Sequence, residues 1–170
     1  MRKLLLQGLL KAPLTEAAPE DAAVDKLAAE LNAAARARLG RSLSIREVDA
    51  GSCNGCELEI HALGNAYYDL ERFGLHVVAS PRHADVLLVT GPVAKNMAEA
   101  LKRTYDATPS PKWVVAAGDC AINGGVFAGS YACAGGVQAI VPVDLKIPGC
   151  PPTPLALLTG LLALLRAGKG

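Results

Sequence analysis

The chain has almost no excess of charge of either sign. Its 170 residues carry 17 Lys and Arg against 16 Asp and Glu, which gives a net charge of +1. Proteins that bind nucleic acid present a surplus of Lys and Arg, because neutralising phosphates supplies much of their affinity. We therefore expect no nucleic-acid partner.

Long apolar runs are also lacking. The most apolar stretch, residues 155–165, is about half of the roughly 20 residues that a membrane-spanning helix needs. At the N-terminus, Gln7, Gly8 and Lys11 interrupt a short leucine-rich stretch before it reaches the length of a signal-peptide core. The expectation is a soluble or membrane-peripheral protein.

Familiar catalytic patterns are missing too. No Ser/His/Asp set or paired carboxylates stand out, and the three histidines show no ligand spacing with one another or with any cysteine. No glycine-rich dinucleotide motif follows the first expected strand. The pairs Gly124-Gly125 and Gly135-Gly136 are interpreted as turns that let the backbone approach a bound group or a partner.

The five cysteines do not fit a disulfide framework. Their number is odd, and four of them are widely spaced and bordered by Gly and Pro, unlike the cysteines of a small secreted domain. A chain of about 150 residues buries roughly 70% of its unfolded surface and needs no such cross-links. A reducing cytosol is the compartment that fits.

Hydrophobic patterns predict an α/β fold with a mostly parallel sheet flanked by helices. Strands are expected at residues 43–48, 75–79, 86–90, 113–117 and 139–143, and helices at residues 21–39, 56–73, 97–105 and 154–166. Residues 1–40 are assigned to a helical N-terminal arm and residues 41–170 to the α/β domain. The arm either covers the domain's own flank or docks on a partner subunit. A leucine group ahead of it could touch a membrane surface or a neighbour: Leu4, Leu5, Leu6, Leu9 and Leu10.

Four cysteines follow predicted strands. Cys53 and Cys56 form a CxxC after the first strand, Cys120 follows Gly118-Asp119, and Cys150 precedes two prolines. Ligands of open α/β sheets collect beyond the carboxyl ends of the strands, where all four thiols are expected. Glycine beside cysteine leaves room and N–H donors for cluster sulfides, so the pattern favours an iron–sulfur cluster.

Other interpretations of the thiols stay open. Zinc also takes four thiolates, although zinc ribbons supply them as two close CxxC pairs, and here the second pair is split by 30 residues. A thioredoxin-like dithiol explains Cys53 and Cys56 but leaves Cys120 and Cys150 unexplained. The cysteines could also be inert buried thiols.

Three nearby residues have weaker assignments. Cys133 is interpreted as a non-ligand, because free cysteines are commonly buried as small hydrophobic residues. Glu57 is expected to interact with the dipole of the helix that follows Cys56. Glu59 is the candidate for carrying protons or hydrogen-bonding a partner near the cluster.

Residues 41–165 resemble the [NiFe] hydrogenase small-subunit family, in particular the small, cluster-carrying subunit that energy-converting (group 4) [NiFe] hydrogenases share with respiratory complex I. The matching motifs are Gly51-Ser52-Cys53-Asn54-Gly55-Cys56-Glu57, Ser80-Pro81-Arg82-His83-Ala84-Asp85, Thr90-Gly91-Pro92-Val93, Gly118-Asp119-Cys120, Val141-Pro142-Val143-Asp144 and Ile147-Pro148-Gly149-Cys150-Pro151-Pro152-Thr153-Pro154. Complex I members have two adjacent cysteines in the first motif. The CxxC and the basic stretch from Arg36 to Arg41 are similar to the formate hydrogenlyase side of the family.

The resemblance implies a flavodoxin-like fold and one [4Fe–4S] cluster held by Cys53, Cys56, Cys120 and Cys150. It also implies an electron-transfer subunit that lies between a ferredoxin-like cluster subunit and a [NiFe] hydrogenase-type large subunit, with no catalytic centre of its own. Integral membrane subunits and a peripheral position on the cytoplasmic face of the membrane complete the expectation. The alternative is the equivalent subunit of a quinone-reducing or nickel-free complex. Backbone N–H donors to the cluster are expected from glycines at Gly55, Gly91 and Gly149.

Overall fold

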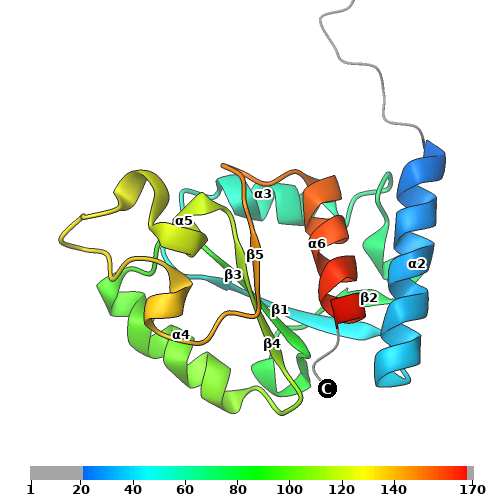
Figure 1. Cartoon of the computed structure of the whole chain (residues 1–170), viewed down its shortest axis with the longest axis horizontal. Coiled ribbons are helices and arrows are strands. Elements are labelled where there is room, and N and C mark those ends of the chain that lie inside the picture. The colour runs from blue at the N-terminus through cyan, green and yellow to red at the C-terminus, as the bar shows by residue number, and fades with distance from the viewer. Residues whose placement is uncertain (1–20, 168–170) are drawn as a thin grey trace, which may run out of the picture.

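The computed structural model describes residues 21–167, which fold around a five-stranded sheet (Figure 1). The strand order is β2-β1-β3-β4-β5, and all neighbouring strands are parallel. This is the flavodoxin-like order, so the predicted fold class is confirmed. The strands are β1 (Leu43–Asp49), β2 (Leu75–Val77), β3 (Val86–Thr90), β4 (Trp113–Ala117) and β5 (Leu145–Ile147).

The two central strands are buried on both faces. Every residue of β3 and β4 is buried, as the continuous apolar runs predict. The two strands pair in register from Val86 and Trp113 to Thr90 and Ala117. Because they end level, the loops that follow them begin side by side at the carboxyl edge of the sheet.

Helices cover the sheet on both sides (Figure 1). One hydrophobic core joins the sheet to α2 (Asp21–Leu39), α3 (Gly55–Ala62) and α6 (Pro154–Ala167). A second core lies on the opposite face under α4 (Lys95–Ala107) and α5 (Asp119–Asn123). Four 3-10 helices occupy connections: η1 (Leu70–Phe73), η2 (Pro81–His83), η3 (Gly125–Phe127) and η4 (Val137–Ala139).

Helix α2 covers the domain's own flank. Its buried residues Val24, Ala28, Leu31 and Ala35 recur at helical spacing, and Leu31 and Ala35 belong to the first core. Ion pairing between Arg166 and Glu30, at 2.8 Å, joins α2 to α6. Of the two alternatives for this helix, the structure supports packing on its own domain. Leu4, Leu5, Leu6, Leu9 and Leu10 lie outside the described residues, and the division at residue 40 stays a prediction.

A buried carboxylate fixes the start of β1 against β3. Asp85, which ends the Ser80–Asp85 motif, accepts hydrogen bonds from Arg41 at 2.6 and 2.8 Å and from the backbone N–H of Ser44 at 2.9 Å. The Asp85 side chain is only 5% exposed. Bidentate pairing of this kind fixes geometry as well as adding stability.

Two predicted elements are wrong: one helix ends earlier than expected, and the last strand lies at a later position. The helix expected over residues 56–73 ends at Ala62, because Asn65 begins a turn in which its side chain accepts hydrogen bonds from the N–H groups of Tyr67 and Tyr68. The last strand is β5, not residues 139–143. Pro142 has no N–H to give to a sheet, and pairing with β4 begins only after Asp144, whose N–H donates to the carbonyl of Val114.

None of the helices within residues 21–167 combines the length and hydropathy that a membrane span requires.

Candidate metal centre

All four cysteines predicted as ligands line one pocket at the carboxyl edge of the sheet. The pocket has a volume of about 90 Å³, and its lining comes from the loops that follow β1, β3, β4 and β5. The residues lining it are Ser52, Cys53, Gly55, Cys56, Gly91, Asp119, Cys120, Gly149, Cys150 and Pro151. Thiols separated by up to 97 positions along the sequence (150 − 53) therefore meet at one place.

The loop that carries Cys53 and Cys56 is held by local hydrogen bonds. The Asp49 carboxylate accepts the N–H groups of Gly51 and Ser52 at 2.8 and 2.7 Å. The Ser52 hydroxyl then accepts the N–H of Asn54 at 3.0 Å. Asn54 takes a left-handed conformation with φ 71° just before α3, which asparagine tolerates better than most residues. These contacts order the loop without using the thiols.

Asp119 ties the other two cysteine loops together. Its carboxylate accepts the N–H of Gly149 at 2.9 Å, and its own N–H donates to the Gly149 carbonyl at 2.9 Å. Cys120 follows Asp119 directly and Cys150 follows Gly149, so one reciprocal pair of hydrogen bonds sets the separation of two thiols. The motif Gly118-Asp119-Cys120 drew attention to Cys120, but the role of Asp119 depends on a residue 30 positions away.

Two glycines that were not predicted as site residues touch cysteine sulfurs. A Cβ atom at Gly118 would lie 2.7 Å from the Sγ of Cys56, and one at Gly125 would lie 2.7 Å from the Sγ of Cys120. Both distances are shorter than real Cβ contacts, so a side chain at either position would displace the thiol. The Gly124-Gly125 pair had been recognised as a turn that allows close approach, whereas nothing in the sequence linked Gly118 to Cys56.

The three predicted glycines also line the pocket. Gly55 lies beside Cys53, since a Cβ there would be 3.5 Å from its Sγ. Gly91 has φ +75° and packs on the backbone of Ser52, and Gly149 has φ +136° and packs on Pro152. Their role as N–H donors to a cluster stays a prediction.

The pocket disfavours negative charge on two of its thiols, those of Cys56 and Cys120, when no metal is present. Burial raises the pKa of Cys56 to about 12, with further contributions from the Glu57 carboxylate and from Cys120, Cys53 and Cys150. Burial also raises the pKa of Cys120, which a hydrogen bond with the Val126 backbone partly offsets. Positive metal charge would remove this penalty, because metal binding favours the thiolate.

The neighbouring candidates have different environments. Glu57 lies in the first turn of α3, as expected, but it is 7% exposed, and both its carboxylate oxygens are buried without a hydrogen-bond partner within residues 21–167. Glu59 is half-buried. Cys133 lies outside the pocket, where its backbone forms an isolated antiparallel β-bridge with that of Ala94.

The thiols surround a space and do not converge on a point. Among residues 21–167, no three His, Cys, Asp or Glu side chains gather closely enough to hold a single metal ion. In a [4Fe–4S] cluster the four cysteines are ligands of a group of several atoms. Four sulfur donors around a pocket with glycine walls suit such a group.

Residues 53–164 match the protein-family model described as "NADH ubiquinone oxidoreductase, 20 Kd subunit". The chain belongs to this family. The match begins at Cys53 and includes Cys120 and Cys150, so all four pocket thiols lie within it. The sequence had indicated the same family from its motifs, and that prediction is confirmed.

Two curated proteins similar to this 20 Kd-type chain carry hydrogenase names. Formate hydrogenlyase subunit 7 of Escherichia coli is 46% identical over 142 residues, which cover 84% of this chain. The chain spans 56% of the length of that relative. The probable membrane-bound hydrogenase subunit mbhJ of Pyrococcus furiosus is 49% identical over 132 residues, which cover 77% of this chain and 79% of that protein.

Two solved structures are similar to the 20 Kd-type chain. A chain of the membrane-bound sulfane sulfur reductase, an archaeal respiratory membrane complex, matches with a TM-score of 0.66 at 35% identity, over 83% of this chain and 77% of that one. A chain of an NAD⁺-reducing [NiFe]-hydrogenase matches with a TM-score of 0.60 at 22% identity, over 76% of this chain and 94% of that one. The second likeness supports the fold alone.

Proposed function

We propose that this chain is an electron-transfer subunit that holds one [4Fe–4S] cluster next to the large catalytic subunit of a membrane-associated, formate hydrogenlyase-type [NiFe] hydrogenase. Cys53, Cys56, Cys120 and Cys150 are the proposed ligands. The observation that carries the proposal is their presence around one pocket at the carboxyl edge of the sheet. Similarity to two hydrogenase subunits over more than three quarters of the chain supports the type of complex.

The chain's own residues prepare the site. Asp49 and Asp119 order the three cysteine loops before any metal is bound. Gly118 and Gly125 leave the thiols of Cys56 and Cys120 the room that a Cβ would take. When bound, the cluster would supply a carrier that accepts and releases single electrons. Assembly requires the thiols to lose their protons, which the raised pKa of Cys56 makes unfavourable without metal.

Exposed apolar side chains occur in the segments that follow the cysteines in sequence, and we call this group the apolar rim. We use this name for the exposed side chains of Leu58, Val126, Phe127, Tyr131 and Leu155. Leu58 follows Cys56 by two residues. Val126 and Phe127 lie in η3, which follows the short helix α5 that holds Cys120, and Leu155 lies in the first turn of α6, after Cys150. Exposed apolar groups at one functional edge are typical of protein interfaces. We propose this rim as the contact with the large subunit, while a ferredoxin-like subunit donates or accepts electrons and integral membrane subunits anchor the complex at the cytoplasmic face.

Two rival functions fit the site less well. A redox dithiol needs an environment that lowers a thiol pKa, whereas burial and the Glu57 carboxylate raise that of Cys56. A zinc site needs four ligands converging on one ion, and side chains of residues 21–167 form no such group. Neither rival uses four thiols spread around a pocket.

A second candidate complex is favoured by one comparison. The 35% identity with a chain of a sulfane sulfur reductase shows a relative in a respiratory membrane complex that is not named as a hydrogenase. Nickel content of the purified complex distinguishes the two candidates. Nickel in stoichiometric amount supports the hydrogenase, and its absence together with a loaded cluster supports a nickel-free or quinone-linked complex.

Iron and acid-labile sulfide analysis of the anaerobically purified complex tests the cluster. About four iron and four sulfide are expected per copy of this chain beyond those of partner subunits. Cys120→Ser and Cys150→Ser should each lower that content and abolish electron transfer. Cys133→Ser is the matched control, because Cys133 lies outside the pocket. Unchanged iron and sulfide in the Cys120 and Cys150 variants would overturn the assignment, and zinc without sulfide would support the zinc rival.

A further inference from the structure

The pocket that holds the four cysteines has one acidic side chain in its wall. Apart from the cysteines, the residues that line it are Asp119 and a set of Gly, Ser and Pro residues. Within residues 21–167, the lining of this cysteine pocket therefore includes a carboxylate and no Lys, Arg or His. Asp119 is the first residue of α5 and directly precedes Cys120.

A hydrogen bond holds this carboxylate without neutralising it. Asp119 Oδ1 accepts the backbone N–H of Gly149 at 2.9 Å. Among residues 21–167, no Lys, Arg or His forms an ion pair with Asp119. The N–H group is an uncharged donor, so it orients the carboxylate and leaves the negative charge in the pocket wall.

The place of Asp119 in the chain keeps its charge close to two thiols. Asp119 is bonded to Cys120 through the backbone, and its hydrogen bond to Gly149 joins it to the residue before Cys150. Both cysteines line the same pocket as Asp119, which is half-buried. Partly buried charges are screened by salt much less than exposed ones. The charge can therefore act on a group held by these thiols.

We propose that the Asp119 carboxylate lowers the reduction potential of the cluster assigned to this pocket. The inference rests on the proposed function, because it needs a cluster at the four cysteines. Reduction adds one negative charge inside the pocket, and a fixed negative charge in the wall opposes that addition. Local charge is one of the factors that set the potentials of iron–sulfur clusters. A carrier of lower potential is the stronger reductant.

Asp119→Asn is the central test, because the amide keeps the size of the side chain and an oxygen that can accept the Gly149 N–H. The potential is measured by redox titration of the anaerobically purified complex, followed by EPR. The signal that belongs to this chain is the one that Cys120→Ser removes. We expect the equilibrium constant for one-electron reduction to rise about tenfold in Asp119→Asn, which is a shift of about 59 mV to higher potential.

Asp119→Glu separates charge from shape, because it keeps the carboxylate. Its potential should stay close to that of the wild type. A shift as large as that of Asp119→Asn would mean that the shape of the side chain, and not its charge, sets the potential, and would overturn the proposal.

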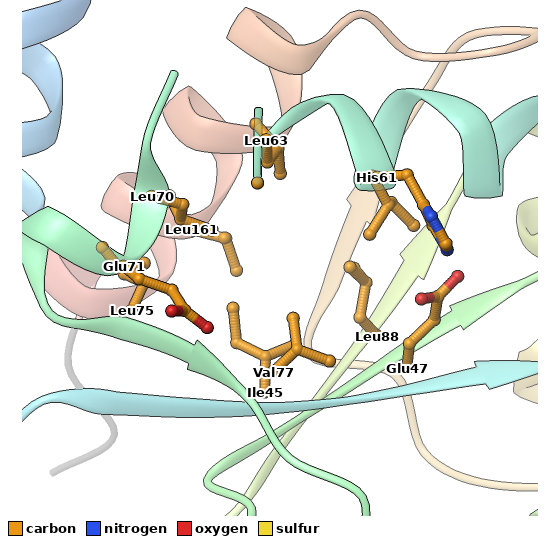
Figure 2. Close-up of a pocket in the computed structure, with 12 residues that line it drawn as sticks. Ile45, Glu47, His61, Leu63, Leu70, Glu71, Leu75, Val77, Leu88 and Leu161 are labelled. Atoms are coloured by element: carbon orange, nitrogen blue, oxygen red, sulfur yellow. The ribbon is translucent and has the colours of Figure 1, made fainter. Parts of the chain in front are cut away.

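The control is a carboxylate outside the cysteine pocket. Glu71 lines a separate cavity of about 240 Å³ between α3, η1, α6 and strands β1 to β3, and Figure 2 shows its carboxylate directed into that cavity. The cavity shares no lining residue with the cysteine pocket. Glu71→Gln also removes one negative charge and should leave the potential unchanged. An equal shift in Glu71→Gln and Asp119→Asn would overturn the specific role of Asp119.

Iron and sulfide content distinguishes a failure of this inference from a failure of the proposed function. A wild-type chain that holds neither iron nor sulfide contradicts both. Normal iron and sulfide in Asp119→Asn together with an unchanged potential contradicts only the role of Asp119. If Asp119→Asn loses iron, Asp119→Ser is the second variant without the charge. Loss of iron from both variants would mean that Asp119 serves assembly and not the potential, which would also overturn the proposal.

Discussion

Gly118 lies against Cys56 so closely that an added Cβ atom would be 2.7 Å from its Sγ. Gly118 also has φ +90°, a conformation that residues with side chains rarely adopt. We expect Gly118→Ala to destabilise the fold by about 1–3 kcal/mol from backbone strain. It should also displace the Cys56 thiol and lower iron and sulfide content, measured alongside urea unfolding.

The matched control for this variant is Gly129→Ala. Gly129 has φ +81°, and a Cβ there would meet nothing within 4 Å. Gly129→Ala should lower the free energy of unfolding through backbone strain, as Gly118→Ala does, and should keep a normal iron content. Equal iron content in the two variants would mean that the Gly118 contact does not position Cys56.

The raised pKa of Cys56 predicts slow alkylation of that thiol. In the folded, metal-free chain the pKa is about 12, against about 8.5 for a thiol in an unfolded chain. At about pH 8, iodoacetamide should therefore modify Cys56 at least roughly tenfold more slowly in the folded chain than in urea. Peptide mass spectrometry after timed quenching measures both rates.

Glu57→Gln separates charge from steric access in that experiment. It removes the second-largest cause of the raised Cys56 pKa while keeping the size of the side chain. Faster alkylation of Cys56 is expected in the folded variant. A rate unchanged by the substitution would mean that access, and not the pKa, limits the reaction.

We expect Glu47 to make a pH-dependent contribution to the free energy of unfolding. Burial, followed by the Glu57 charge, raises its pKa in the folded state above the ordinary value of 4.5. The folded state therefore binds the proton more tightly, and this contribution is present below the unfolded pKa and lost as pH rises through the folded value. Glu47→Gln lacks this dependence, so its unfolding free energy relative to wild type should rise between about pH 4 and pH 8. Denaturant unfolding at several pH values gives the difference, and a difference independent of pH would contradict it.

The apolar rim predicts a variant that separates cluster binding from subunit assembly. Val126 is 80% exposed, and its backbone forms a hydrogen bond with Cys120. Val126→Asp should weaken co-purification with the large subunit at least tenfold, because burying an unpaired carboxylate in an interface is costly. Iron content of the chain should stay unchanged.

Val77→Asp is the control for that variant, since Val77 is exposed on edge strand β2 and lies outside the rim. It should leave co-purification unchanged. If both variants lose the large subunit, or if neither does, the apolar rim is not the contact surface for the large subunit.

The sequence alone was sufficient to predict the fold class and the gathering of four cysteines at one edge of the sheet, while their role as ligands stays a prediction. Continuous apolar runs such as residues 86–90 and 113–117 indicate strands buried on both faces, and parallel strands end at one edge. Cysteines that follow three of these strands are then brought together by topology. Local sequence pattern and global fold agree here, so the pattern of apolar runs predicts the edge of the sheet at which the cysteines lie.

Contacts between distant residues were decided only by the tertiary structure. The hydrogen bonds between Asp119 and Gly149 and the close approach of Gly118 to Cys56 join positions that no local pattern relates. The early end of α3 depends on a turn at Asn65, and a cavity of about 240 Å³ lies beside Glu47 between α3, η1 and the sheet. Spacing along the chain determines which elements form, whereas the room left between them depends on how side chains from several elements pack together.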